Sequence, residues 1–231
     1  MKIFTVVGIR KSGKTSTVEA LIKEINARGK KVGTCKSIFC PGFSIDKPDS
    51  NTARHIKAGS AMVCARAKNE TTFIRPGELS LSEVAAAFEG NDYLILEGDY
   101  LSPVARIVCA HKDKDASERI NDLTICCAGR IAALAESAVS LPRYNALEDA
   151  AALLDFIDAH VPDTSLTQAL DVSLPPVPGV TGDGFCQCGC HHNEHKLQSK
   201  GITVIVDGKE IKLSPEQTKL VRSWAGENAH D

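Results

Sequence analysis

The fold follows from residues 2–29, which read KIFTVVGIRKSGKTSTVEALIKEINARG. Residues 2–8 are short, rich in β-branched side chains and end at a glycine, which predicts a buried strand. Residues 15–28 carry one apolar stripe at helical spacing before a terminal glycine, which predicts an amphipathic helix. The loop between them, Gly8–Thr15, matches G-x-x-x-x-G-K-[ST]. Strand, loop and helix in this order predict a P-loop that binds a nucleoside triphosphate.

The spacing assigns a role to each part of this loop. Backbone N–H groups from Lys11 to Thr15 point at the phosphates, and the helix N-terminus adds partial positive charge. Lys14 reaches the β- and γ-phosphates, and the hydroxyl of Thr15 binds Mg²⁺. The predicted nucleotide-binding residues of the loop are Gly8, Lys11, Ser12, Gly13, Lys14, Thr15 and Ser16. Ile9 stands where the deviant P-loop ATPases have a second lysine, so that subclass is disfavoured.

Strand and helix patterns alternate through the first 160 or so residues. This alternation predicts an α/β P-loop NTPase fold with a mainly parallel sheet sandwiched by helices. Short apolar runs at Tyr93–Leu96, Val104–Cys109 and Leu123–Cys126 supply further strands, and a helix runs from about Leu147 to His160. We expect residues 1–161 to form the nucleotide-binding domain.

A carboxylate at the end of a second strand should complete the magnesium site. Glu97 ends the apolar run YLILE and fits this role best, with Asp99 as the weaker candidate. We therefore place Lys14, Thr15 and Glu97 in the catalytic set, with Thr15 and Glu97 as magnesium ligands. The guanine-reading motif N-K-x-D is absent from the sequence. The motifs alone do not decide whether the bound nucleotide is GTP or ATP.

Composition excludes several other classes of protein. The chain has 231 residues and a net charge of −2, so no basic field indicates nucleic acid or an anionic membrane surface. No apolar run approaches the ~18 residues of a membrane span, and the N-terminus does not resemble a secretion signal. We expect a cytoplasmic protein. Five cysteines lie in short apolar stretches, where a thiol behaves as a small hydrophobe: Cys35, Cys64, Cys109, Cys126 and Cys127.

The composition changes after the first domain. Residues 162–184 are rich in proline and read as a linker. Residues 202–213, ITVIVDGKEIKL, alternate around Asp207-Gly208 and predict a β-hairpin. Ser214-Pro215-Glu216-Gln217 combines a cap, a first-turn proline and a capping-box glutamine, which predicts a helix. We therefore expect residues 185–231 to form a small extension that contains a metal-binding motif, the hairpin and the helix.

That motif is the cysteine–histidine cluster, FCQCGCHHNEH, residues 185–195. It holds Cys186, Cys188, Cys190, His191, His192 and His195. Thiolate and imidazole together suit Zn²⁺, Ni²⁺, Cu⁺ or an iron–sulfur cluster. The spacing C-x-C-x-C matches no standard zinc class. The sequence leaves three arrangements of the metal ligands open. One chain could supply all four ligands, two chains could share a site across a dimer, or Cys40 could complete the site.

Three segments resemble the MobB family of molybdopterin-guanine dinucleotide biosynthesis proteins. They are VVGIRKSGKTSTVEALIKEINARGKKVGTCKS, IDKPDSNTARHIKAGS and DYLILEG, and the likeness spans about residues 1–160. The tail VDGKEIKLSPEQ is similar to the C-terminal extension of some longer members. The resemblance implies a dimeric, GTP-binding P-loop protein with weak GTPase activity, which assists the nucleotidyltransferase that attaches GMP to the metal pterin. It also assigns Lys36, Asp46, Asp49, Ser50 and Glu97 to family motif positions, and it implies that Lys36, Asp46 and Asp49 belong to the nucleotide-binding set.

The sequence departs from the family pattern at three places. Ser37-Ile38-Phe39-Cys40 replaces the histidines that follow the strand-end lysine. A Gly-Lys pair is missing between Pro48 and Asp49, and Asp99-Tyr100 stands where members have Phe-Lys. Asp46 and Asp49 have a second interpretation, in which they only form a turn in a proline-containing loop. These departures concern the partner or the pterin more than the nucleotide.

An alternative function follows from the cysteine–histidine cluster. In a metallochaperone NTPase, triphosphate binding would gate delivery of the held metal to a metalloenzyme during its maturation. A small-molecule kinase is disfavoured, because neither a substrate-orienting acid nor an arginine-rich lid is identifiable in the sequence.

Overall fold

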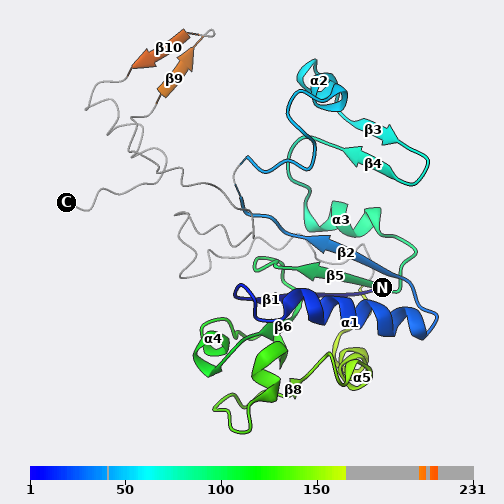
Figure 1. Cartoon of the computed structure of the whole chain (residues 1–231), viewed down its shortest axis with the longest axis vertical. Helices are drawn as coiled ribbons and strands as arrows, with labels where there is room; N and C mark the ends of the chain where they lie inside the picture. The colour runs from blue at the N-terminus through cyan, green and yellow to red at the C-terminus, as the bar shows by residue number, and fades with distance from the viewer. Residues whose placement is uncertain (41, 165–202, 207–208, 213–231) are drawn as a thin grey trace. The chain divides into compact units, whose positions relative to one another are not determined.

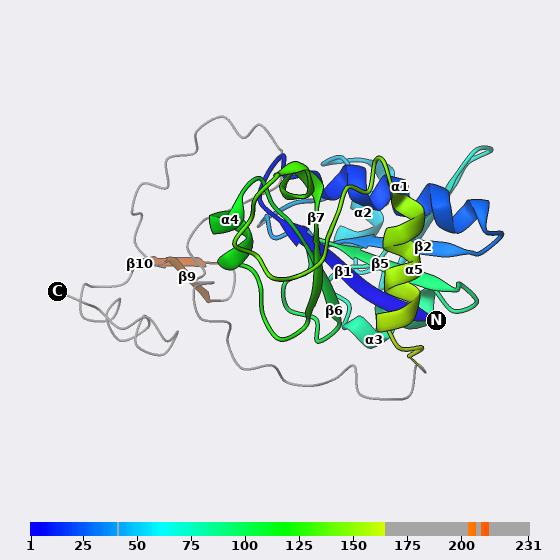
Figure 2. The ribbon, with the colours of Figure 1, turned by 90° about the horizontal axis from the view of Figure 1, so that it is seen from below.

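Six strands form one sheet in the order β2-β5-β1-β6-β7-β8 (Figure 1). The strands are β1 Lys2–Gly8, β2 Val32–Lys36, β5 Tyr93–Glu97, β6 Ala105–Cys109, β7 Thr124–Ala128 and β8 Arg143–Tyr144. Every neighbouring pair is parallel. β1 lies between β5 and β6 (Figure 2), so the loop that follows it opens at the middle of the carboxyl edge. The predicted α/β class is confirmed.

The computed structural model describes residues 1–40, residues 42–164 and the strands 203–206 and 209–212. The chain divides into two units, Met1–Gly189 and Cys190–Asp231. In the second unit, β9 Thr203–Val206 pairs antiparallel with β10 Lys209–Lys212, which confirms the predicted hairpin. The predicted linker, the cysteine–histidine cluster and the helix at Ser214 lie outside the described residues.

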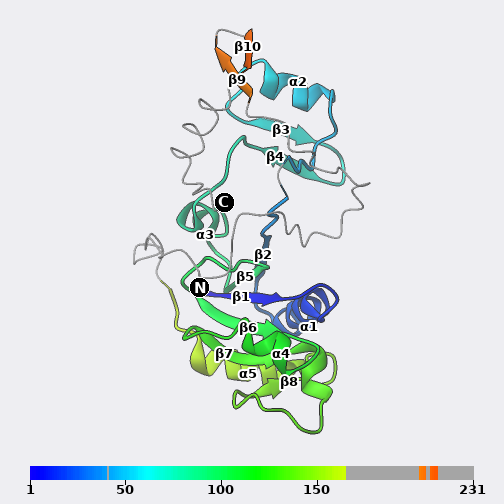
Figure 3. The same cartoon turned by 90° about the vertical axis from the view of Figure 1, so that its left-hand side faces the viewer.

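Alternate side chains of β1 face opposite sides of the sheet. Phe4 and Val6 pack with residues of helices α1, Lys14–Ala27, and α5, Ala150–His160. Ile3 packs on the other face with helix α3, Leu81–Ala87. Figure 3 shows α1 and α3 on opposite sides of β1 and β5. Since successive strand residues point to opposite faces, the same alternation decides which strand-end side chains face α1.

The helix boundaries follow from local capping. α3 begins with a capping box, in which the side chains of Ser80 and Glu83 accept from each other's backbone N–H groups. α5 begins at Ala150 rather than near Leu147, because Asp149 is its N-cap and accepts from the Ala152 N–H. The preceding residues, Asn145 to Asp149, form a turn in which the Asn145 carbonyl accepts from two backbone N–H groups.

Three short elements were absent from the sequence prediction. They are the helix α4 Asp113–Ser117, the 3₁₀ helix η1 Gly129–Ala133 and the strand β8. Outside the large sheet, α2 Asn51–Lys57 precedes β3 Val63–Arg66 and β4 Thr71–Ile74, which pair antiparallel. In the described part of the chain, no helix has the length and apolar character of a membrane span.

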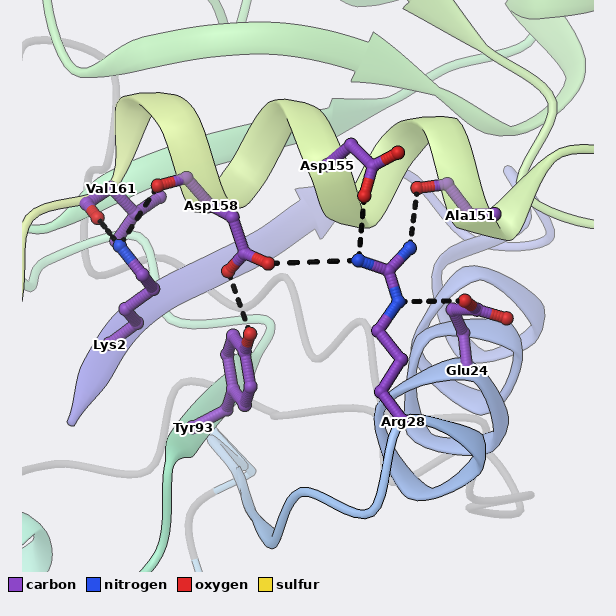
Figure 4. Close-up of polar contacts among 8 residues, drawn as sticks. All are labelled: Lys2, Glu24, Arg28, Tyr93, Ala151, Asp155, Asp158 and Val161. Atoms are coloured by element: carbon purple, nitrogen blue, oxygen red, sulfur yellow. Dashed lines mark hydrogen bonds and ion pairs between the residues drawn. The ribbon is translucent and has the colours of Figure 1, made fainter.

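A polar cluster holds α5 at the amino edge of the sheet (Figure 4). Tyr93 donates to Asp158 at 2.7 Å, and Lys2 donates to the carbonyls of Asp158 and Val161. Arg28, at the end of α1, pairs with Asp155 at 2.6 Å and with Glu24 at 2.8 Å. This cluster lies at the opposite end of β1 from the phosphate loop, so it fixes α1 and α5 without entering the candidate site.

Candidate nucleotide site

The phosphate loop joins the carboxyl end of β1 to the first turn of α1. At Gly8 a Cβ would lie 2.0 Å from the carbonyl oxygen of Cys109, so only glycine fits there. Ser12 is fully buried, and its hydroxyl donates to the Ile9 carbonyl at 2.8 Å. The loop is therefore held by its own backbone and by β6, and its side chains are arranged before any ligand arrives.

Lys14 lies folded over this loop. Its Nζ donates to the carbonyl oxygens of Gly8 at 2.8 Å and Ile9 at 2.7 Å. Burial lowers the pKa of Lys14 below its ordinary value, against the opposing effect of Cys109 and Glu97. A phosphate supplies a full negative charge in place of these two neutral acceptors, so it binds the ammonium more strongly than the carbonyls do.

Thr15, at the amino end of α1, meets Glu97 and Lys36, which end the strands β5 and β2. Glu97 Oε1 accepts from Thr15 Oγ1 at 2.9 Å and from Lys36 Nζ at 2.7 Å. Glu97 has the same orientation as Tyr93 and Ile95, which pack toward α1, so its carboxylate reaches the first turn of that helix. The side chain of Glu97 is 11% exposed and that of Lys36 is 58% exposed.

The donor set at this edge fits a magnesium ion. Mg²⁺ prefers hard oxygen ligands and is held by one or two protein oxygens together with phosphates and water. Thr15 and Glu97 present a hydroxyl and a carboxylate oxygen to each other at 2.9 Å. Lys36 already neutralises the carboxylate, so a cation here shares or replaces that ion pair.

Asp99 and Tyr100 follow Glu97 and serve the loop in different ways. The Asp99 carboxylate accepts from the N–H groups of Leu101 and Ser102 and from the Ser102 hydroxyl, so it closes a local turn. Tyr100 instead reaches the phosphate loop: its hydroxyl accepts from the Gly8 N–H at 2.9 Å and donates to the Gly8 carbonyl at 3.0 Å. Sequence reasoning missed Tyr100, although its place just after a strand end was a signal.

Asp46, Asp49 and Ser50 form contacts within their own loop. Asp46 accepts from the Ser50 hydroxyl at 2.8 Å, and Ser50 caps α2 by accepting from the Ala53 N–H. Asp49 has a left-handed backbone with φ of 63°. These features describe a turn that starts α2. The assignment of Asp46 and Asp49 to the nucleotide therefore stays a prediction from the resemblance.

A cavity of about 700 Å³ lies beside the phosphate loop. Its lining comes from the phosphate loop and first turns of α1, from the start of η1 and from the turn before α5. The lining residues are Lys11, Gly13, Lys14, Thr15, Ser16, Thr17, Gly129, Arg130, Ala133, Asn145, Ala146 and Leu147. Gly129 allows the close approach of η1, because a Cβ there would lie 2.2 Å from the Ser12 carbonyl oxygen.

The cysteines of the described residues are mostly core residues. Cys109, Cys126 and Cys127 are buried, and burial raises the pKa of the Cys109 thiol to about 12. The expectation for Cys64 is wrong: it is exposed on β3, because a two-stranded sheet leaves one face open. Residues 1–164, without residue 41, contain no group of three or more His, Cys, Asp or Glu side chains that could hold a metal.

Comparison with known proteins agrees with this geometry. Residues 3–135 match the MobB family, described as molybdopterin guanine dinucleotide synthesis protein B. A relative from Methanocaldococcus jannaschii, named a putative molybdopterin-guanine dinucleotide biosynthesis adapter protein, is 24% identical over 96% of this chain and 88% of its own length.

Solved structures support the fold. Two structures of Bacillus subtilis MobB superpose with TM-scores of 0.55 and 0.52, at 19% and 20% identity. Each covers 71% of this chain and 100% of its own. The family match spans more than half of the residues and includes the phosphate loop, Lys36 and Glu97. The chain therefore belongs to the MobB family of molybdopterin guanine dinucleotide synthesis proteins.

Proposed function

We propose that this chain binds GTP and Mg²⁺ at the phosphate loop and acts as an adapter in molybdopterin guanine dinucleotide synthesis, with weak GTPase activity. One observation carries the nucleotide part. The loop threonine, Thr15, and the strand-end carboxylate, Glu97, are in hydrogen-bond contact at 2.9 Å although they lie 82 residues apart. Membership of the MobB family supports the biosynthetic role.

The chain's own groups divide the work of holding the triphosphate. The loop N–H groups and the start of α1 bind phosphate oxygens, and Lys14 turns from the Gly8 and Ile9 carbonyls to the β- and γ-phosphates. Thr15 and Glu97 hold Mg²⁺, which neutralises charge on the phosphates. Lys36 stands beside Glu97 at 2.7 Å, where it adds a second positive charge to this edge of the site.

Hydrolysis by the isolated chain is expected to be slow. Fast GTPases position the attacking water with a glutamine and neutralise the transition state with an arginine finger. Residues 1–164 contain no glutamine. A turnover well below the ~10 s⁻¹ typical of enzymes fits an adapter whose nucleotide state is read by a partner. A rate at or above that value would contradict the adapter role.

The partner side of the proposal concerns exposed apolar residues. Phe39, Phe43 and Ile45 in the loop after β2, and Met62 and Phe73 near the β3–β4 pair, are 47–80% exposed. Isolated apolar residues are normal on surfaces, but several along one stretch of chain indicate a protein interface. We assign them to a homodimer contact or to the nucleotidyltransferase. Light scattering of wild type and Phe73→Asp measures whether this side chain supports the dimer.

Equilibrium binding of GTP with Mg²⁺ to the purified full chain tests the nucleotide part. Lys14→Ala is expected to weaken binding about 100-fold or more, because a buried charge contact to phosphate is lost. Its thermal stability should stay near that of wild type, since Lys14 bonds only to loop carbonyls. Lys57→Ala, an equal charge change on α2, is the control and should bind GTP normally. Wild-type affinity in Lys14→Ala would contradict the assignment.

A further inference from the structure

The cavity beside the phosphate loop opens on one side of β1, and the strands that carry Glu97 and Lys36 lie on the other. Sheet order places β5 and β2, which carry Glu97 and Lys36, on one side, and β6, β7 and β8 on the other. Besides the phosphate loop and the first turns of α1, the cavity is lined from this second side, by the residues that follow β7 and β8. This inference rests on the proposed triphosphate binding. With Mg²⁺ and the terminal phosphates at Glu97, the nucleoside must leave the loop toward the cavity.

The cavity is large enough for a base and its sugar. Its volume of about 700 Å³ falls within the usual range of small-molecule pockets. Its lining includes the phosphate-loop residues Gly13 to Ser16 and also Leu147, which is 74% exposed. An exposed leucine at the rim of a pocket offers an apolar cover for a flat ring.

The polar side chains on the nucleoside side of this cavity are hydrogen-bond donors. Asn145 Oδ1 accepts from the Leu147 N–H at 3.3 Å, which orients the amide and leaves its NH₂ as the remaining group. Within residues 1–164, no hydrogen-bond acceptor is found for that NH₂ or for the exposed Arg130 guanidinium. The cavity lining contains no carboxylate. A ligand in this cavity therefore faces hydrogen-bond donors of the protein and must itself supply hydrogen-bond acceptors.

Guanine supplies acceptors where adenine does not. The edge of guanine presents N7 and O6, which are both acceptors, whereas adenine presents the N7 acceptor beside the N6 amino donor. We propose that Arg130 and Asn145 are the base-selecting residues of this chain and take the N7/O6 edge of guanine, with Leu147 over the ring. This deepens the proposed function, because it explains a preference for GTP without the motif N-K-x-D. The expected preference for GTP over ATP is about tenfold to 100-fold.

Three triphosphates and one isosteric variant test the proposal. Kd values for GTP, ATP and ITP are measured with wild type and Asn145→Asp, in the full-length protein with Mg²⁺. ITP keeps N7 and O6 but lacks the 2-amino group, so it should bind wild type as GTP does. Asn145→Asp keeps the oxygen that accepts from Leu147 and replaces the donor by an acceptor. It should lower the GTP-to-ATP affinity ratio about tenfold or more.

The ratio of GTP affinity to ATP affinity is the quantity compared, because the negative charge added in Asn145→Asp repels every triphosphate equally. Asn121→Asp is the matched control: Asn121 also orders a turn through its Oδ1, which accepts from the Leu123 N–H, but it precedes β7 and does not line the cavity. Its ratio should equal that of wild type. Arg130→Leu should also lower the ratio; an equal loss for all three nucleotides would show that Arg130 binds phosphate and overturn its assignment to the base.

The inference and the proposed function fail in different ways. If wild type binds GTP and ATP alike while Lys14→Ala binds neither, the phosphate site stands and base selection by Asn145 is wrong. If ITP binds as weakly as ATP, the N7/O6 edge is not what the chain reads. If wild type binds no triphosphate, the proposed function itself fails.

Discussion

Glu97 is the residue on which the magnesium assignment depends. It is 9% exposed and accepts from Thr15 and Lys36 through the same oxygen. Glu97→Gln keeps the shape and this acceptor oxygen but removes the charge that attracts a cation. We expect the ratio of GTP affinities with and without Mg²⁺ to fall about tenfold to 100-fold, as for losses at other metal sites. Calorimetric titrations in excess Mg²⁺ and in EDTA measure that ratio.

Asp99→Asn is the control for this substitution. Asp99 lies two residues beyond Glu97, but its carboxylate accepts from Leu101 and Ser102 rather than from the loop threonine. Its removal should leave the Mg²⁺ dependence of GTP binding unchanged. The assignment would be contradicted by an equal loss in Asp99→Asn or by unchanged Mg²⁺ dependence in Glu97→Gln.

Among the elements, α5 depends on the polar cluster at the amino edge of the sheet (Figure 4). Tyr93 is 6% exposed, and its hydroxyl donates to Asp158 at 2.7 Å. Tyr93→Phe removes one hydrogen bond to a charged group, which should cost about 1.5–3 kcal/mol in the free energy of unfolding at pH 8. Tyr144→Phe is the control, because the Tyr144 ring packs against Phe156 and its hydroxyl donates to no described group. Tyr144→Phe should lower the free energy of unfolding by less than Tyr93→Phe does.

The same tyrosine predicts a dependence on pH. Burial, and then the bond to Asp158, raise the pKa of Tyr93 well above its ordinary value of 10.0. A raised pKa in the folded state means that this stabilisation is complete below pH 10 and is lost as pH rises further, because the unfolded chain ionises first. The stability gap between wild type and Tyr93→Phe should therefore narrow as the pH of urea titrations rises from 10 to 11. A constant gap across this range would contradict the assignment.

The sequence predicted the long helices and strands, and it predicted the functional residues that lie close together in one segment of the chain. The β1–loop–α1 unit and the β9–β10 pair have local signals in the sequence, and the structure contains both. α4, η1 and β8 are 2–5 residues long, too short for a periodic pattern. Arg130 and Asn145 come together with the phosphate loop only through the order of strands in the sheet. Spacing along the chain does not encode that order.

At the scale of the whole molecule, the chain divides into two units. The phosphate loop and its cavity belong to the unit Met1–Gly189, and the hairpin belongs to the unit Cys190–Asp231. The cysteine–histidine cluster, which spans the boundary in sequence, stays a prediction from composition. Since the core of the first unit is built from β1, β5, β6, α1 and α5, we expect nucleotide binding to be independent of ligands in the tail.

The tail prediction concerns a metal. If Cys186, Cys188 and Cys190 are ligands, they bind as thiolates, so binding releases protons and weakens as pH falls. The triple Cys→Ser variant of the full chain should lose the stoichiometric metal of the anaerobically purified protein and still bind GTP like wild type. Cys64→Ser, which removes an exposed cysteine on β3, should keep the metal. Elemental analysis with parallel GTP titrations measures both properties.

Metal retained by the triple variant would refute the ligand assignment. Joint loss of metal and GTP binding would mean that the two units are coupled, as delivery of a metal under nucleotide control requires.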